Sequence, residues 1–280
     1  MILFKKAGPL TAYIQQQKSL GKTVGFVPTM GALHKGHISL LALSKQQTDI
    51  AVCSIFVNPT QFNDPEDFKR YPVTVEKDIA QLSAAGADIL FLPSVEEIYP
   101  PNHIKKQYGL GEIETLWEGH YRPGHFQGVC EVVDRLLNIV QPNQLHMGQK
   151  DYQQCMVIKK LLALTGKEKD IQLHIVPTQR EASGLAMSSR NQRLSPDEKQ
   201  KASSIYQALH YIKDNIYSMP PEVLMKQATA QLQEKGFTVD YIAIADAHTL
   251  QPATDISKPL IALAAAYLGK VRLIDNLLLN

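Results

Sequence analysis

Two histidines and two glycines fall within eight residues, where a short apolar run meets a helix-length segment. The run Val24–Val27 leads through Pro28 and Thr29 into this segment. Its glycines permit a backbone turn close to a ligand, so we expect phosphate to meet backbone amides there. The two histidines lie three residues apart at the start of the helix and share one face near its positive end. The segment therefore predicts a polyphosphate site formed by Met30, Gly31, Ala32, Leu33, His34, Lys35, Gly36 and His37.

A second group of phosphate-binding side chains lies much later, in the loop Gly184-Leu-Ala-Met-Ser-Ser-Arg190. The guanidinium of Arg190 is a planar fork for phosphate oxygens, and Ser188 and Ser189 are short hydroxyl donors. Such donors can follow negative charge as it moves onto a leaving pyrophosphate. Together with the histidine segment, the loop indicates transfer chemistry at an α-phosphate.

Lys150 and Asp151 follow the strand-like run Gln144–Met147 and open a helix. Lys150 can reach a phosphate as a point charge, whereas Asp151 can either cap helix amides or accept a ribose hydroxyl. Gln154 lies about one turn further along, so we expect it to point into the same pocket.

Gln61 lies in the polar loop Phe56–Asn63, which follows the second apolar run. A carboxamide can bind a carboxylate or a hydroxyl through paired hydrogen bonds, which suits the selection of a small polar substrate. Further along, Glu118 and the stretch Arg122-Pro-Gly-His-Phe-Gln-Gly128 precede a helix. This region is either a lid or an interface, and the sequence leaves both open.

Each segment also has a plainer interpretation, as a satisfied strand-helix turn, a solvated serine loop, a capped helix or a polar turn. Their combination in one chain favours phosphate chemistry. An HExxH metalloprotease site is excluded, because the histidine spacing differs and no glutamate base lies between them. Gln61 and Gln154, added to the phosphate groups, indicate a small carboxylate as the nucleophile.

Composition narrows the class of partner. The 29 basic and 27 acidic residues give a net charge of +2 and form no basic run, so we expect small-molecule partners and no nucleic acid. No apolar run reaches the roughly 18 residues that indicate a membrane span, and the start of the chain lacks a signal-peptide pattern. Cys53, Cys130 and Cys155 lie far apart in apolar contexts, which predicts buried thiols in a reducing, cytoplasmic compartment.

Alternating apolar runs and amphipathic segments predict an α/β fold, a Rossmann-like doubly wound parallel sheet with a smaller α+β C-terminal domain. The expected strands are Val24–Val27, Ile50–Val57, Asp88–Leu92, Gln144–Met147 and Ile171–Val176, and the expected helices are 9–20, 36–47, 74–85, 127–140 and 151–165. Such sheets bind ligands at the carboxyl ends of their strands.

The pattern changes near residue 177, so we expect a first domain at 1–176 and a second at 177–280. The second domain should hold helices near 196–217 and 220–235, with strands near 239–245, 260–266 and 271–274. We expect the first domain to bind the nucleotide and the acid, and the second to act as a lid or contribute to substrate binding.

The motifs together resemble those of the pantothenate synthetase family, within the superfamily of nucleotidylyltransferases that carry a His-x-Gly-His signature and a KMSKS-type loop. The resemblance runs from the first predicted strand almost to the last residue. It is carried by Pro28–His37, Asn58–Phe62, Arg122–Phe126, Lys150–Gln154, Gly184–Asn191 and Arg272-Leu-Ile-Asp-Asn276.

The resemblance implies that ATP and pantoate form pantoyl-adenylate and pyrophosphate, after which β-alanine attacks to give pantothenate and AMP. His37 would act as an acid or stabilise charge at the phosphates, with His34 in support, and Lys150 would partly neutralise the developing charge. Gln61 and Gln154 would hold pantoate. It also implies magnesium on the triphosphate and a homodimer. The remaining residues expected to line ATP are Gly148, Gln149, Asp151, Gln179, Met187, Ser188, Ser189 and Arg190.

No metal ligand is assigned from the sequence, although Asp78 and Gln81 are weak candidates for an outer ligand of magnesium. Three positions depart from the family pattern. Gln149 replaces the usual glutamate, Gln179 a small apolar residue and Ser183 a frequent acidic residue. Two rival functions are a nucleotidylyltransferase that moves AMP onto a phosphorylated substrate and a nucleotide sensor without activity.

Overall fold

A parallel sheet forms the core of the first part of the chain. The structure is a computed structural model that describes residues 1–63 and 65–280. Within these residues, six strands pair in the order β1-β4-β3-β2-β5-β6, and all the pairs are parallel. The predicted doubly wound sheet is thus confirmed. Its strands are β1 (Ile2–Phe4), β2 (Val24–Thr29), β3 (Ile50–Ile55), β4 (Ile89–Phe91), β5 (Gln144–Gly148) and β6 (Gln172–Val176).

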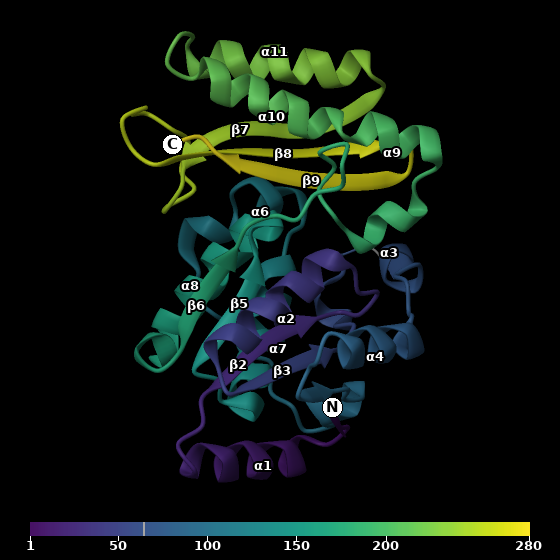
Figure 1. Cartoon of the computed structure of the whole chain (residues 1–280). Helices are drawn as coiled ribbons and strands as arrows, with labels where there is room; N and C mark the ends of the chain where they lie inside the picture. The colour runs from purple at the N-terminus through teal and green to yellow at the C-terminus, as the bar shows by residue number, and fades with distance from the viewer. Residues whose placement is uncertain (64) are drawn as a thin grey trace. The chain divides into compact units, whose positions relative to one another are not determined.

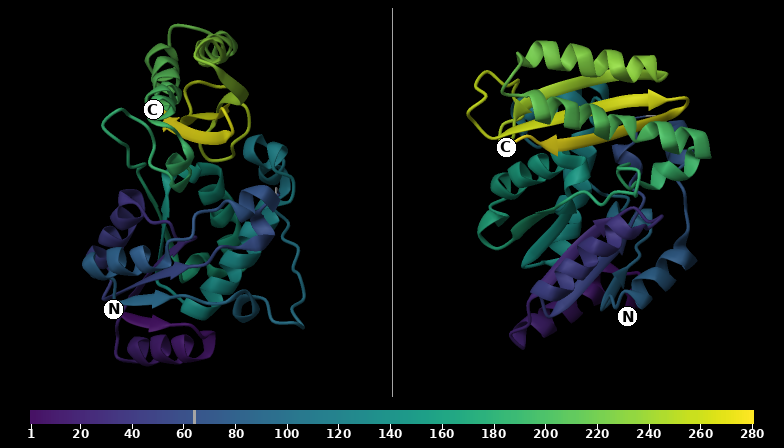
Figure 2. Two further views of the ribbon diagram at one scale, coloured as in Figure 1. Left: turned by 90° about the vertical axis from the view of Figure 1, so that its right-hand side faces the viewer. Right: turned by 45° about the horizontal axis from the view of Figure 1, so that its top comes forward.

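The central strands are apolar because helices cover both faces of this sheet. All six residues of β3 are buried. Helix α2 packs against β2 and β5, and helix α7 packs against β2 and α1; α2 and α7 lie on opposite faces (Figure 2). The α-helices that precede residue 177 are α1 (Ala7–Ser19), α2 (Lys35–Gln47), α3 (Pro65–Lys69), α4 (Val75–Ala84), α5 (Val95–Ile98), α6 (Trp117–Tyr121), α7 (His125–Val140) and α8 (Tyr152–Leu164).

The strand order reverses at β2. From β2 the chain continues to β3 and β4 on one side of the sheet, whereas β5 and β6 lie on the other. In open α/β sheets the crevice at such a switch point binds ligands, outside the carboxyl ends of the strands. The ends of β2 and β5 carry Met30 and Gly148, so the fold directs attention to the predicted phosphate segments.

The chain divides into two units. The first contains Met1–Leu110, Gly124–Gly148 and Val157–Pro177, and the second contains Gly111–Pro123, Gln149–Met156 and Thr178–Asn280. The second unit therefore includes two short segments that precede residue 177. The assignment of separate functions to 1–176 and 177–280 stays a prediction.

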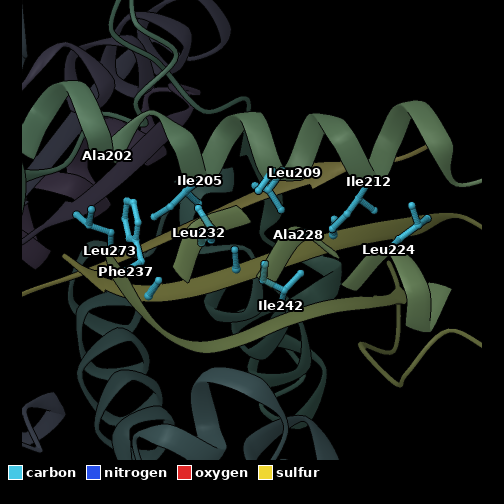
Figure 3. Packing of buried hydrophobic residues seen from close by; sticks show 14 of the residues in the cluster. Ala202, Ile205, Leu209, Ile212, Leu224, Ala228, Leu232, Phe237, Ile242 and Leu273 are labelled. Carbon is cyan, nitrogen blue, oxygen red and sulfur yellow. The ribbon is translucent and has the colours of Figure 1, made fainter. Parts of the chain in front are cut away.

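The second unit is built on an antiparallel sheet with the order β7-β8-β9, formed by β7 (Phe237–Asp246), β8 (Leu260–Leu268) and β9 (Val271–Leu278). Helices α10 (Ser204–Asn215) and α11 (Pro221–Glu234) cover one face of it (Figure 1). Ile205, Leu209 and Ile212 recur at helical spacing along α10 and pack into this core (Figure 3). Truncating one of these leucines or isoleucines to alanine would cost about 2–5 kcal/mol of stability.

Most predicted elements are present, with two informative differences. The strand β1 was missed, because three residues at the edge of a sheet are too short for a periodic signal. The predicted helix 196–217 is interrupted at Ser203, whose hydroxyl donates to the carbonyl of Gln200 at 2.7 Å and competes with the helix ladder. The interruption separates α9 (Pro196–Ala202) from α10.

Two predictions from composition are also tested by the structure. The three cysteines are free thiols and buried, as predicted. In the described part of the chain, no helix is both long and apolar enough to cross a membrane.

Candidate functional site

The turn after β2 has a left-handed backbone at two successive residues. Gly31 has φ of +80° and Ala32 has φ of +49°, a conformation that is uncommon for a residue with a side chain. A Cβ at Gly31 would lie 3.0 Å from Oδ2 of Asp78 and 3.1 Å from Cγ2 of Ile55. The glycine is thus required both by backbone conformation and by space.

Our expectation of open amides in this turn is wrong. The Ala32 and Leu33 amides donate to the carboxylate of Asp78, each at 2.8 Å. The Gly31 amide donates to Oγ1 of Thr29 at 3.2 Å. Because the fold itself uses these donors, any phosphate at this turn has to be bound mainly by side chains.

Asp78 lies in α4 and is only 1% exposed. Besides the two amides, its Oδ1 accepts the hydroxyl of Thr74 at 3.1 Å. A buried carboxylate with three hydrogen bonds has the surroundings of a structural clamp. The suggestion that Asp78 is an outer ligand of magnesium therefore loses its support, and the residue instead fixes the turn that precedes the histidines.

The two imidazoles are oriented by the first turn of α2. His34 caps the helix, and its Nδ1 accepts the amide of Gly36 at 3.2 Å. The Nδ1 of His37 accepts the amide of His34 at 3.3 Å, and the ring centroids are 4.0 Å apart. A neutral imidazole that accepts at Nδ1 carries its proton on Nε2. Both rings thus adopt the tautomer in which Nε2–H is the donor, the form that suits an anionic ligand.

Gln61 is brought to the same turn. Its Nε2 lies 3.0 Å from Sδ of Met30, and its Oε1 accepts Nδ2 of Asn58 at 3.2 Å. Asn58 is 1% exposed, and its Oδ1 accepts the hydroxyl of Tyr99 at 2.9 Å. Sequence reasoning missed Asn58 as a positioning residue, because its partners become neighbours only in the folded chain.

The start of α7 supports Gln61 from another direction. Nδ1 of His125 lies 2.7 Å from the carbonyl oxygen of Gln61. A Cβ at Gly128 would lie 2.3 Å from the carbonyl oxygen of Thr60, so only glycine allows this close approach of helix and loop. His125 and Gly128 belong to the stretch left open as a lid or an interface; within the first unit they act as a fixed support of the Gln61 loop.

Lys150 and Asp151 lie in the second unit, in the 3-10 turn η3 (Gln149–Asp151). Their side chains pair, with Nζ of Lys150 at 3.4 Å from Oδ1 of Asp151. Desolvation raises the pKa of Asp151, but the positive charges of Lys150, Arg190 and Arg122 outweigh it and hold that pKa below the ordinary value. The turn is thus a cationic neighbourhood in which Asp151 stays ionised.

The Ser188–Arg190 loop has an ordered local structure. The hydroxyl of Ser188 accepts the amide of Arg190 at 3.3 Å and caps η5 (Ser189–Arg193). The carbonyl of Gln179 accepts the amide of Met187 at 2.9 Å. Gln179 is exposed, and its side chain takes no part in that backbone contact.

The first residues of α8 hold the segment that contains Glu118. Nε2 of Gln153 donates to the carbonyls of Ile113 and Leu116, each at 2.8 Å, and its Oε1 accepts the amide of Glu118 at 3.0 Å. Gln153 is 4% exposed, whereas its neighbour Gln154 is half-buried. Gln153 therefore has a structural task, and Gln154 stays the candidate for substrate binding.

The potential metal ligands in the described part of the chain do not form a dedicated metal site. Among residues 1–63 and 65–280, no three His, Cys, Asp or Glu side chains gather in a way that could hold a metal ion.

The predicted residues thus form two groups. In the first unit, Met30, the two histidines and Gln61 are linked through one turn and its neighbours. In the second unit, Lys150, Asp151 and Arg190 are close enough for their charges to interact.

Comparisons with known proteins find one family that matches almost the whole chain. The family model described as Pantoate-beta-alanine ligase matches residues 2–278. A pantothenate synthetase from Moorella thermoacetica is 42% identical over 100% of this chain and 99% of its own. One from Dehalococcoides mccartyi is 44% identical over 91% of this chain and 96% of its own.

Solved structures of similar proteins have the same fold. The pantothenate synthetase from Thermus thermophilus has a TM-score of 0.92 and 39% identity, with 99% of both chains covered. The pantoate-beta-alanine ligase from Francisella tularensis, solved with beta-gamma ATP and beta-alanine, has a TM-score of 0.83 and 38% identity. The match covers 99% of this chain and 97% of that chain.

Proposed function

The chain belongs to the pantoate–β-alanine ligase family of enzymes, and we propose that it joins the two substrates through a pantoyl-adenylate. In the first step the pantoate carboxylate attacks the α-phosphorus of ATP, which releases pyrophosphate. In the second step the amine of β-alanine attacks the acyl carbon, which gives pantothenate and releases AMP. Both steps depend on positioning and charge stabilisation more than on covalent catalysis.

The observation that carries the proposal is the hydrogen-bond pattern of the paired imidazoles, from which their tautomer follows. Because Nδ1 of His34 and Nδ1 of His37 both accept backbone amides, the donor of each neutral ring is Nε2–H. Two such donors side by side suit the charge that accumulates on phosphate oxygens in the first step. His37 is the proposed charge stabiliser, and His34 supports it.

The other predicted residues divide the remaining tasks. Lys150 and Arg190 would neutralise the triphosphate, Lys150 as a point charge and Arg190 as a planar fork. Gln61 and Gln154 would bind pantoate without a charge of their own. The Francisella tularensis relative was solved with beta-gamma ATP and beta-alanine, which supports ATP and β-alanine as two of the substrates.

Magnesium, a homodimer and a cytoplasmic location belong to the same proposal through the family resemblance. Magnesium would reduce the negative charge of the triphosphate and is expected to travel with it. Sedimentation of the purified chain at several concentrations tests the dimer, and a monomer at all of them would contradict it.

The deciding experiment is the exchange of labelled pyrophosphate into ATP, followed by product analysis. Exchange should require pantoate, and AMP should appear with pantothenate when β-alanine is added. Exchange that depends instead on a phosphorylated acceptor would support the rival nucleotidylyltransferase. ATP binding without AMP release under any of these conditions would support the nucleotide sensor.

A further inference from the structure

We propose that Asn276 and Asp275, at the end of β9, are positioning residues. Asn276 would position the turn that contains Lys150, and Asp275 would position the arm, residues 180–186, which leads to the Ser188–Arg190 loop. All of these residues lie in the second unit. The inference rests on the proposed function, since it gives two strand residues a task in the ATP-dependent step.

The side chain of Asn276 makes three hydrogen bonds to the turn that contains Lys150. Its Nδ2 donates to the carbonyl of Gln149 at 2.8 Å and to the carbonyl of Lys150 at 2.9 Å. Its Oδ1 accepts Nε2 of Gln149 at 3.2 Å. The side chain of Asn276 is 2% exposed, so water could not replace these hydrogen bonds if they were lost. Buried polar groups would then be left unsatisfied, which is costly.

The contact between Gln149 and Asn276 matches a side-chain donor with a side-chain acceptor. A glutamate at this position would offer an acceptor to Oδ1 of Asn276 where glutamine offers a donor. In this chain the pair Gln149 and Asn276 is thus complementary as it stands.

Asp275 holds the second element. Its carboxylate accepts both ends of the Arg180 guanidinium, at 2.6 Å and 2.9 Å, and Arg180 also donates to the carbonyl of Gly184 at 3.1 Å. The guanidinium lies 3.7 Å from the ring centroid of Tyr206. Arg180 pairs with Ala186 in an isolated bridge, so the ion pair fixes the arm 180–186 directly before the serine loop.

The two positioning residues are consecutive and sit on a rigid strand. Asp275 pairs with Ala264 of β8, and Asn276 pairs with Leu263. The amide of Asn276 also donates to Oδ1 of Asp275 at 2.8 Å, which orients the carboxylate. Residues on a paired strand are located more precisely than residues on loops. The end of β9 therefore positions both the turn that contains Lys150 and the arm that precedes the serine loop.

The consequence concerns rate more than stability. Lys150 and Arg190 act by the position of their charges, and a displacement of about 1 Å in a reacting arrangement can cost roughly 100-fold in rate. Asn276 holds the carbonyl of Lys150 itself, so its loss should displace that charge.

The test compares Asn276→Asp with Asn280→Asp. Asn280 is exposed and serves as the control for the bonding pattern, because its Oδ1 accepts an N–H, the Leu260 amide at 2.7 Å, and its Nδ2 donates to a carbonyl, that of Lys258 at 2.8 Å. Both partners lie outside the two loops. Asn276→Asp should lower pantoate-dependent pyrophosphate exchange about 10- to 100-fold. Asn280→Asp should stay within about 2-fold of the parent. Asn276→Ala is the second variant if a buried aspartate prevents folding.

The mechanism is separated from simple destabilisation by a double-mutant cycle with Lys150→Ala. If Asn276 acts through Lys150, its substitution should have little further effect on exchange once the lysine is absent, whereas melting temperatures should add. Equal losses in both backgrounds, or an unchanged rate in Asn276→Asp, would overturn the inference. Arg180→Lys, which keeps the charge but loses the fork, tests the Asp275 contact by the same exchange assay.

Failure of the proposed function gives a different result. A parent chain without pantoate-dependent exchange would refute the ligase reaction, whatever the variants do. The same cycle can then be measured as the dissociation constant for ATP. Coupling between Asn276 and Lys150 in ATP affinity would still support the positioning role, and its absence would contradict it.

Discussion

The Oδ1 atom of Asp78 accepts the backbone amide of Leu33 at 2.8 Å, across 45 residues of sequence. With the neighbouring bond from Ala32, this contact holds the left-handed turn that places the histidines at the start of α2. A turn with a strained residue persists when its surroundings hold it firmly. Asp78 is the group that does so here.

Asp78→Asn should therefore impair the nucleotide step. Asparagine keeps one acceptor but opposes a backbone N–H with its own NH₂, so the turn loses one of its two bonds. We expect pyrophosphate exchange to fall about 10-fold, with no change in the magnesium concentration that gives half-maximal rate. A large increase in that magnesium concentration would show that Asp78 is a metal ligand after all. Lys77→Ala, at an exposed residue of the same helix, is the control.

The proposed role of His37 can be tested with substitutions that each retain the hydrogen-bonding function of one of its two ring nitrogens. Asparagine can replace Nδ1 as acceptor for the His34 amide but has no donor at the place of Nε2, whereas glutamine can supply that donor. We expect His37→Asn to lower exchange by roughly 100-fold or more while keeping the melting temperature near that of the parent. His37→Gln should retain more activity. Equal activities in the two variants would contradict a role for Nε2–H.

Substitution of Gln61 should weaken the binding of pantoate much more than that of ATP. Removal of a hydrogen bond to a charged group costs about 1.5–3 kcal/mol, so Gln61→Ala should raise KM for pantoate roughly 10- to 100-fold. The nearly isosteric Gln61→Glu should raise it further, because a carboxylate would repel the substrate. KM for ATP should change much less in both. Equal changes for the two substrates would place Gln61 outside the acid pocket.

The sequence predicted those features that local pattern determines. Buried β-branched runs marked β2 and β3, and helical spacing of apolar residues marked α10 and α11. The closeness of His34 and His37 at the start of the helix was predicted, but the contact itself is a capping box, because His34 has an extended backbone and caps α2.

The supports of the site were not predictable, because they depend on contacts between distant residues. Asp78 binds a turn 45 residues earlier, and Asn276 binds a carbonyl 126 residues earlier. Nothing in the local sequence distinguishes such an Asp or Asn from one at a solvated surface. The same reason explains the error about open amides, since the partner that occupies them lies on another helix.

His146 gives a prediction for acid stability. It is 0% exposed, lies on β5 opposite His174 of β6, and the two rings stack with centroids 4.9 Å apart. Its Nε2 lies 3.2 Å from Oε1 of Gln47. Burial, together with the neighbouring His174, lowers the pKa of His146 from 6.5 to about 4. The folded chain thus keeps this ring neutral at a pH where the unfolded chain protonates it.

Between these two values the unfolded state binds more protons, so the free energy of unfolding should fall as the pH drops from about 6.5 to about 4 and lose no more from this group below that. The loss attributable to His146 is up to about 3 kcal/mol. Urea unfolding of the parent and of His146→Gln at pH 7 and pH 4.5 measures it, because the other titrating groups largely cancel in the difference. His146→Gln should show the shallower pH dependence, whereas His248→Gln, at an exposed histidine, should follow the parent. Parallel pH profiles for the parent and His146→Gln would show that the buried imidazole is not held neutral.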